Sequence, residues 1–226
     1  MTERTTEKEN RSEFEERKLE LIAIDGLAGT GKSTLAKALA ERLGLNYLDT
    51  GATFRMMALA MLRSNVRLED EDEVMRAVDS VDISYEKGKC MVNGVDVTNS
   101  VRDEKVSTAA SIIAVHPRLR GRLLNWQRSW VLSHGASVVE GRDTTSAVFP
   151  DAAVKVYLEA DAEVRAARRS EATASTIAER DKRDSERKAA PLIRVPAAVA
   201  IDTTRLSRAE VENIVVDLWE RHTSKQ

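Results

Sequence analysis

The stretch LIAIDGLAGTGKST, residues 21–34, decides the fold. Its centre, Gly26 to Ser33, is a complete G-x-x-x-x-G-K-[ST] phosphate-binding loop. The apolar run 21–24 before it predicts a buried strand, and residues 34–43 after it have the composition of a helix that ends at Gly44. Strand, loop and helix in this order are the context in which the motif binds nucleotide phosphates. The alternative interpretation is a flexible glycine turn before a helix, but a chance match with these flanks is rare.

The loop motif carries its own mechanism. Glycines let backbone N–H groups turn inward around phosphate oxygens, and the N-terminus of the following helix adds a partial positive charge. Lys32 is expected to reach the β- and γ-phosphates of a nucleotide, and the Ser33 hydroxyl is expected to hold Mg²⁺. The residues that we assign to nucleotide binding here are Gly26, Leu27, Ala28, Gly29, Thr30, Gly31, Lys32, Ser33 and Thr34.

The composition indicates a globular protein without a strong field of one sign. Of the 226 residues 42% are hydrophobic, and 35 Lys and Arg against 37 Asp and Glu give a net charge of −2, which argues against nucleic-acid binding. Cys90 is the single cysteine, so an intramolecular disulfide and a cysteine metal cluster are excluded. No apolar run reaches membrane-spanning length and none follows Met1, so we expect a cytoplasmic protein without membrane contact. The polar, charge-rich residues 1–18 predict a disordered tail.

Apolar strands alternate with helical segments along the chain, which predicts an α/β fold with a five-stranded parallel sheet covered on both faces. The expected strands are 21–24, 45–48, 136–139, 154–158 and 197–201. The expected helices are 34–43, 52–62, 69–81, 103–115, 118–134, 161–190 and a last one that runs from the capping box at Ser207 and Glu210 to about residue 221. Residues 82–98 differ, because three short strands and the Asn93-Gly94 turn predict a small antiparallel insert.

Polar clusters follow the predicted strands, and in a parallel sheet the carboxyl ends of the strands share one edge. Besides the phosphate loop, the clusters are Asp49-Thr50-Gly51 with Arg55, Glu140-Gly141-Arg142-Asp143, and Asp202-Thr203-Thr204. Arg142 directly after a buried strand has two interpretations. It forms a structural ion pair with Asp143 or Glu140, or it clamps a second phosphate, for which a guanidinium is suited.

An arginine-rich segment follows the fourth strand. Arg180, Arg183 and Arg187 recur at intervals of three and four residues, so they share one face of a helix. A second basic turn nearby in sequence consists of Arg165, Arg168 and Arg169. Alternating charge of this kind often indicates only a solvated helix face. The functional alternative is a mobile lid whose arginines reach substrate phosphates and exclude water.

Taken together, the motifs resemble those of the bacterial cytidylate kinases. The resemblance runs from about Leu21 to the last helix. The segments that carry it are 24–34, 48–55, 109–111, 117–120, 140–143, 148–152, 179–187, 190–192 and 201–204. It implies a nucleoside monophosphate kinase fold of the three-layer P-loop type: a core over 19–64 and 99–226, an acceptor-binding insert over about 65–98 and a lid over about 165–190.

The resemblance also implies an activity, transfer of the γ-phosphoryl group of ATP to CMP or dCMP with Mg²⁺, and a monomeric enzyme. By position it assigns CMP binding to Thr50, Arg55, Ser111, Arg120, Arg142, Asp143, Arg180 and Arg187. Ser111, Arg120 and Asp143 are expected on the cytosine and sugar side, and the remaining arginines on the phosphate. Arg168 is assigned to ATP. The catalytic set is Lys32, Arg142, Arg180, Arg183 and Arg187.

Three departures from the family pattern stand out. Phe54 replaces a usual tyrosine, Thr144-Thr145-Ser146 replaces an apolar residue followed by glycine and threonine, and the segment between Arg169 and Arg180 is shorter. Two alternatives to a CMP kinase stay open. One is another small-molecule P-loop kinase, acting on UMP, AMP or a non-nucleotide acceptor such as shikimate. The other is a nucleotide-binding switch or interaction module, although a guanine-reading Asn-Lys-x-Asp motif is absent from the sequence.

Overall fold

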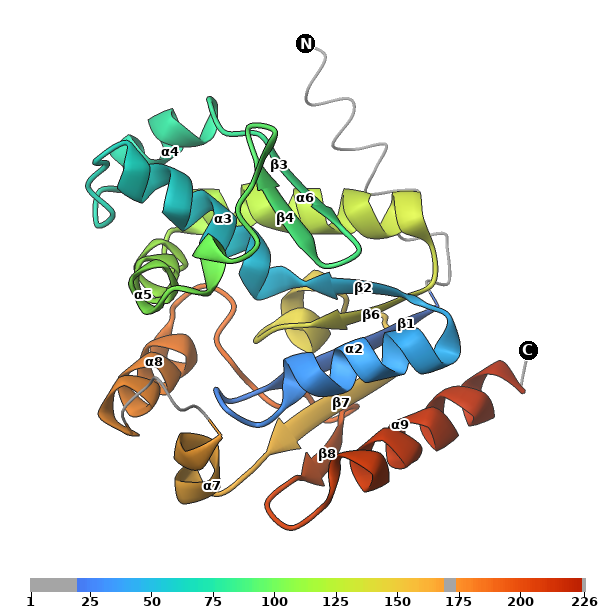
Figure 1. The fold of residues 1–226 in the computed structure, drawn as a ribbon. Helices are drawn as coiled ribbons and strands as arrows, with labels where there is room; N and C mark the ends of the chain where they lie inside the picture. The colour runs from blue at the N-terminus through green and yellow to red at the C-terminus, as the bar shows by residue number, and fades with distance from the viewer. Residues whose placement is uncertain (1–19, 169–173, 225–226) are drawn as a thin grey trace.

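A five-stranded parallel sheet forms the centre of the protein (Figure 1). The computed structural model describes residues 20–168 and 174–224, without the side chains of residues 174–177 and Arg180. The order of the strands across the sheet is β2-β6-β1-β7-β8. Their bounds are β1 Leu21–Gly26, β2 Asn46–Asp49, β6 Ser137–Glu140, β7 Val154–Glu159 and β8 Val199–Asp202. The predicted five-stranded parallel sheet is therefore confirmed.

Helices cover both faces of this sheet, which gives three layers (Figure 1). On β1, Leu21 and Ala23 point into one core and Ile22 and Ile24 into the other, as the alternation of a strand requires. One face carries α2 Lys32–Leu43 and α9 Arg208–Thr223. The other carries α3 Thr50–Arg63, α5 Glu104–Ile113 and α6 Pro117–His134. This double burial explains why β1 is apolar at consecutive positions.

The predicted insert is a three-stranded antiparallel sheet in the order β3-β4-β5. Its strands are β3 Ile83–Glu86, β4 Lys89–Val92 and β5 Val95–Asp96. Asn93 and Gly94 both have positive φ, 48° and 75°, which suits a tight hairpin turn and confirms the predicted one. Tyr85 and Cys90 belong to the same buried cluster as α3 and α6, so the insert packs onto the core. The 3₁₀ turn η1 Ser100–Arg102 leads back to α5, and α4 Glu71–Val78 precedes the insert.

Two segments differ from the sequence prediction. Instead of one helical stretch over 161–190, the chain forms α7 Ala162–Ala167 and α8 Ala174–Glu186. A short π-helix, η2 Thr144–Val148, follows β6 where no helix was predicted. The buried Asp25 carboxylate accepts the backbone N–H groups of Thr144 and Thr145 at 2.9 and 2.7 Å, and these contacts stabilise the first turn of η2.

The predicted charged tail, residues 1–18, lies outside the described residues. Among the helices of the described ranges, none is long and apolar enough to span a bilayer.

Candidate active site

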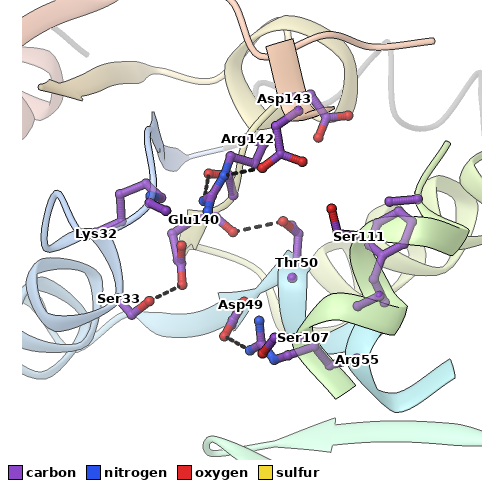
Figure 2. Close-up of a pocket in the computed structure, with 18 of the residues that line it drawn as sticks. Lys32, Ser33, Asp49, Thr50, Arg55, Ser107, Ser111, Glu140, Arg142 and Asp143 are labelled. Atoms are coloured by element: carbon purple, nitrogen blue, oxygen red, sulfur yellow. Dashed lines mark hydrogen bonds and ion pairs between the residues drawn. The ribbon is translucent and has the colours of Figure 1, made fainter. Parts of the chain in front are cut away.

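A cleft of about 430 Å³ opens at the carboxyl edge of the sheet (Figure 2). Its walls come from the phosphate loop, the first turns of α3, helix α5, the loop after β6 and helix α8. The parallel register explains the convergence, since Glu140 at the end of β6 lies beside Ile24 on one side and Asp49 on the other. The sequence clusters that follow β1, β2 and β6 therefore meet in one cavity.

The phosphate loop runs between β1 and α2 with its glycines in conformations that other residues rarely adopt. Gly26 has φ of 150°, and a Cβ there would lie 2.3 Å from the carbonyl oxygen of Leu158, so only glycine fits beside β7. The carbonyl of Leu27 accepts hydrogen bonds from Lys32 Nζ at 2.7 Å and Thr30 Oγ1 at 2.9 Å. Of the nine predicted positions, six line the cleft: Ala28, Gly29, Gly31, Lys32, Ser33 and Thr34. Gly26, Leu27 and Thr30 shape the loop instead.

Glu140 is a site residue that the sequence analysis considered only as a possible ion-pair partner of Arg142, without a binding or metal-ligating role. It ends β6 next to β1, is 4% exposed, and accepts a 2.6 Å hydrogen bond from Ser33 Oγ (Figure 2). Burial and the neighbouring Asp49 raise the pKa of the Glu140 carboxyl, against the attraction of Lys32. The missed signal was an acidic residue at the end of an apolar strand paired with the strand of the phosphate loop. A hydroxyl and a carboxylate in contact are oxygen ligands of the kind that Mg²⁺ prefers.

The cluster after β2 is organised by Asp49. Its side chain caps α3 by accepting the Ala52 N–H at 2.9 Å, and its other oxygen pairs with Arg55 Nη2 at 2.6 Å. Burial alone would raise the pKa of Asp49, but Arg55, the Ala52 N–H and Arg142 together outweigh burial, so that pKa lies below its usual range. Thr50 Oγ1 donates to the Glu140 carbonyl at 2.9 Å, which fixes α3 against β6. Arg55 and Thr50 both line the cleft, as predicted.

The predicted cytosine-side residues come from α5, α6 and the loop after β6. Arg120 and Asp143 form a buried ion pair, and the guanidinium of Arg120 stacks over the Phe54 ring at 5.3 Å from its centroid. Arg120 borders a smaller adjoining cavity of about 130 Å³, and Asp143 borders both this cavity and the main cleft. Phe54, which departs from the family pattern, also lines both cavities. Ser111 lines the main cleft from α5.

Helix α8 contacts the loop after β6 and helix α5. Arg142 Nε pairs with Asp184 Oδ2 at 2.9 Å, so the predicted structural partners, Asp143 and Glu140, are wrong. Nearby Asp184 raises the pKa of the Arg142 guanidinium despite the opposing effect of burial. Arg183 Nη1 donates to Ser111 Oγ at 2.7 Å. Asp184 lines the cleft and was missed, because alternating charge on a helix usually indicates solvation alone.

Arg187 follows the end of α8 and is almost fully buried. Its guanidinium lies 3.8 Å from Asp143 Oδ1 and 3.6 Å from Asp184 Oδ1, and it donates to the Ala190 carbonyl at 2.6 Å. Burial, with repulsion by Arg120, lowers the pKa of Arg187. Its Nε has no hydrogen-bond partner in the described part of the chain. The predicted Arg180 belongs to α8, but its side chain lies outside the described residues.

Arg168 lies on the other side of the phosphate loop. It donates to Thr203 Oγ1 at 3.0 Å and to the Thr203 carbonyl at 2.8 Å. It lines a separate cavity of about 250 Å³ beside Gly31 and Thr34. The structure therefore brings Arg168 to the phosphate loop, as an ATP contact requires, but not into the main cleft.

The segment Thr144-Thr145-Ser146, which departs from the family pattern, contacts the strand that precedes the phosphate loop. Thr145 donates to Asp25 through its hydroxyl at 2.7 Å, in addition to the two backbone N–H groups. Burial still raises the pKa of Asp25, although these three donors favour its ionised form. The hydroxyl that replaces the usual glycine thus adds a direct link between the Arg142 loop and β1.

Fold and cleft together define a P-loop phosphotransferase, with a phosphate loop on one wall and clustered arginines and carboxylates on the other. Comparison with known families narrows this class. The family model for cytidylate kinase matches residues 22–221. This chain therefore belongs to the cytidylate kinase family.

Individual relatives agree with this assignment. A cytidylate kinase of Mycobacterium avium (strain 104) is 41% identical over 214 residues, covering 88% of this chain and 94% of the relative. A cytidylate kinase of Geobacillus sp. (strain WCH70) is 40% identical over 213 residues, covering 87% and 95%. Among solved structures, TT1252 from Thermus thermophilus is similar at 21% identity and a TM-score of 0.45, covering 88% of this chain and 96% of that one. Values this low do not indicate a function.

Proposed function

We propose that this protein transfers the γ-phosphoryl group of ATP to CMP and dCMP, giving ADP and the corresponding diphosphate. The observation that carries the proposal is one cleft that is lined both by the phosphate loop and by a second set of cationic side chains. A nucleotide switch needs only the phosphate loop. Arg142, Arg55 and Arg187 in the second set match a further phosphate ligand, because guanidinium groups bind phosphate oxygens in bidentate fashion.

The donor side binds through the backbone of residues 28–33 and the Lys32 ammonium. Lys32 would exchange its Leu27 carbonyl for β- and γ-phosphate oxygens. Ser33 and Glu140 fit a magnesium site, since hydroxyl and carboxylate oxygens already contact each other at the mouth of the loop. When bound there, Mg²⁺ would neutralise charge on the donor phosphates. No group of three or more His, Cys, Asp or Glu side chains suited to a metal occurs in residues 20–168 and 174–224, so substrate phosphates and water would complete the coordination.

The acceptor side positions the monophosphate. Its attacking oxygen is already anionic, so the reaction requires no general base, and catalysis reduces to orientation and charge stabilisation. Arg55 and Arg142 are held rigidly by Asp49 and Asp184 and point into the cleft. Arg187 brings an unpaired Nε donor to the same wall. Arg180 and Arg183 complete the predicted arginine set on α8.

Cytosine recognition is supported by Ser111 and Asp143, which line the cleft, and by Arg120, which pairs with Asp143 and borders the smaller adjoining cavity. Such a mixed donor and acceptor set suits an aminopyrimidine edge better than an aliphatic acceptor. The assignment of these residues rests on the family resemblance and on their positions. A cytoplasmic, monomeric enzyme is the corresponding proposal for localisation and assembly.

The test is ADP release from Mg-ATP with CMP, dCMP, UMP, AMP and GMP as acceptors. We expect the fastest release with CMP or dCMP, and its loss in Lys32→Ala, which removes the ammonium from the donor site. A maximal rate with UMP or AMP would reassign the acceptor. ATP binding without any acceptor-dependent ADP release would instead favour the nucleotide-binding module.

A further inference from the structure

Helix α8 is attached to the phosphate loop through a carboxylate that the catalytic set does not use. Asp181 Oδ1 accepts the backbone N–H of Ala28 at 2.9 Å, across 153 positions of sequence. Its other oxygen, Oδ2, pairs with Arg165 Nη1. The Asp181 side chain is only 10% exposed, so water screens these contacts little.

Arg165 closes the same attachment from α7. Its Nη1 donates to the carbonyl of Ala28 at 3.1 Å, and its Nε donates to the Ala160 carbonyl at 3.2 Å. The neighbouring Gly29 permits this approach, because a Cβ there would lie 2.6 Å from the Arg165 carbonyl oxygen. Both backbone polar groups of Ala28 are therefore held, the N–H by Asp181 and the carbonyl by Arg165. Figure 1 shows α7 and α8 next to each other beyond the carboxyl ends of the strands.

The other contacts of α8 reach the acceptor wall of the cleft. Arg183 donates to Ser111, and Asp184 pairs with Arg142. Positions 181 and 184 are one turn apart and so lie on the same face of the helix. A displacement of Asp181 would consequently move Asp184, and with it the guanidinium of Arg142. One rigid helix thus spans from the donor loop to the acceptor-binding side chains.

We infer that Asp181 and Arg165 are positioning residues that hold α8 against the phosphate loop, so that the acceptor-side arginines keep their register with the transferred phosphoryl group. This inference rests on the proposed kinase reaction. Ala28 belongs to an anion-binding loop, and a carboxylate satisfies its N–H more strongly than a neutral acceptor would. The same carboxylate neutralises Arg165, whose charge would otherwise be left unpaired on a side chain that is only 12% exposed.

Two variants of Asp181 separate the two contacts. Asp181→Asn keeps an oxygen for the Ala28 N–H but turns an NH₂ group toward the Arg165 guanidinium, and Asp181→Ala removes both contacts. We expect kcat to fall about 10- to 100-fold in either variant, with KM for ATP and CMP changed less than about threefold, because misplacing reacting groups by about 1 Å can cost 10²-fold. Arg165→Met should give a similar loss, and the double variant Asp181→Asn/Arg165→Met should be no worse than either single variant. Glu186→Gln, an exposed carboxylate on the same helix, is the matched control and should behave like wild type.

A second measurement is independent of catalysis. Amide hydrogen exchange at Ala28, followed by NMR in the nucleotide-free protein, should be slow in wild type and Glu186→Gln and at least about tenfold faster in Asp181→Ala. Equal exchange in wild type and Asp181→Ala would overturn the inference even if the protein proved not to be a CMP kinase. Unchanged kcat with tighter ATP binding in Asp181→Asn would also overturn it, because Asp181 would then compete with nucleotide rather than position α8. A wild type without acceptor-dependent turnover but with a protected Ala28 amide would contradict the proposed function and leave the attachment itself in place.

Discussion

The substitution Gly141→Ala adds a single methyl group, yet we expect it to lower both the stability and the activity of the protein. Gly141 follows β6 directly and donates its N–H to the Ile24 carbonyl at 2.9 Å, so its backbone is held beside the phosphate-loop strand. A Cβ on Gly141 would lie 2.3 Å from Thr50 Oγ1 and 2.5 Å from Thr144 Oγ1. Both threonines are buried, 5% and 0% exposed, and only Thr50 borders the cleft. Gly141→Ala must therefore displace both side chains.

The expected loss in the free energy of unfolding has two contributions. Overpacking a rigid site by one methyl group costs about 1–3 kcal/mol. The displaced Thr50 also loses its hydrogen bond to the Glu140 carbonyl, worth about 1 kcal/mol. We expect the free energy of unfolding to fall by about 2–4 kcal/mol and Tm by roughly 4–16 °C for a chain of this size. Activity should fall by about 10²-fold as well, since Arg142 is the next residue.

The assay is thermal and urea unfolding followed by circular dichroism, with ADP release measured below the transition. Gly121→Ala is the matched control, because a Cβ at that helical position meets nothing within 4 Å; it should stabilise α6 by about 0.5–1 kcal/mol. The triple variant Gly141→Ala/Thr50→Ala/Thr144→Ala removes both clashing hydroxyls and should recover part of the stability. The steric reasoning is refuted if Gly141→Ala unfolds within about 0.5 kcal/mol of wild type, or if the triple variant is no more stable than the single one.

Three further predictions concern the charged groups. Thr145→Ala removes a hydroxyl donor from the buried Asp25 carboxylate and should cost about 1.5–3 kcal/mol in urea unfolding; Ser146→Ala, whose hydroxyl contact is 3.4 Å long, should cost less than about 0.5 kcal/mol, and equal losses would contradict the assignment. Arg142→Ala should lower kcat by about 10³-fold, and Arg142→Lys by less, because lysine keeps the charge but not the fork; a wild-type rate in Arg142→Ala would remove it from the catalytic set. Glu140→Gln should flatten the pH dependence of stability. Because the pKa of Glu140 is raised in the folded protein, its contribution to stability is fully present below the unfolded pKa of 4.5 and is lost as pH rises through the folded pKa. Wild type should therefore lose stability toward neutral pH, and the variant should keep it. Parallel stability curves for the two proteins from pH 4.5 to 7.5 would contradict this sign.

Local signals predicted the fold well because they act over short distances. The apolar run before the phosphate loop, the Asn93-Gly94 turn and the Ser207 capping box each specify their structure within a few residues, and the structure contains all three. The π-helix η2 was not predictable in this way. It depends on the Asp25 carboxylate, which lies 119 positions away in sequence from its nearer partner.

The site shows the same division. Chain order and strand ends were enough to bring the phosphate loop, Arg55 and Arg142 to one edge of the sheet. The ion-pair partners were not predictable. Glu140 and Asp143 were the partners expected for Arg142 from the sequence, but Arg142 pairs with Asp184 on α8. Arg142 and Asp143 lie in a bend after the end of β6, where strand alternation no longer fixes the direction of the side chains, so proximity in sequence is a poor guide to ion pairs there. Asp184 reaches Arg142 only because α8 packs against the loop after β6, and this tertiary contact leaves no local signal in the sequence.

These partners explain how so many cations can share a small cleft before any substrate arrives. Arginines bind carboxylates throughout the described site, as the pairs Arg55–Asp49, Arg120–Asp143, Arg142–Asp184 and Arg165–Asp181 show. Without those carboxylates the guanidinium groups would repel one another at low dielectric, and the unpaired charges would destabilise the fold by several kcal/mol. A nucleotide phosphate therefore replaces or joins an existing anion instead of neutralising a bare cation. We expect the free energy of binding to be correspondingly modest. The geometry of each arginine is set in advance, and preset geometry is what a reaction governed by orientation and charge requires.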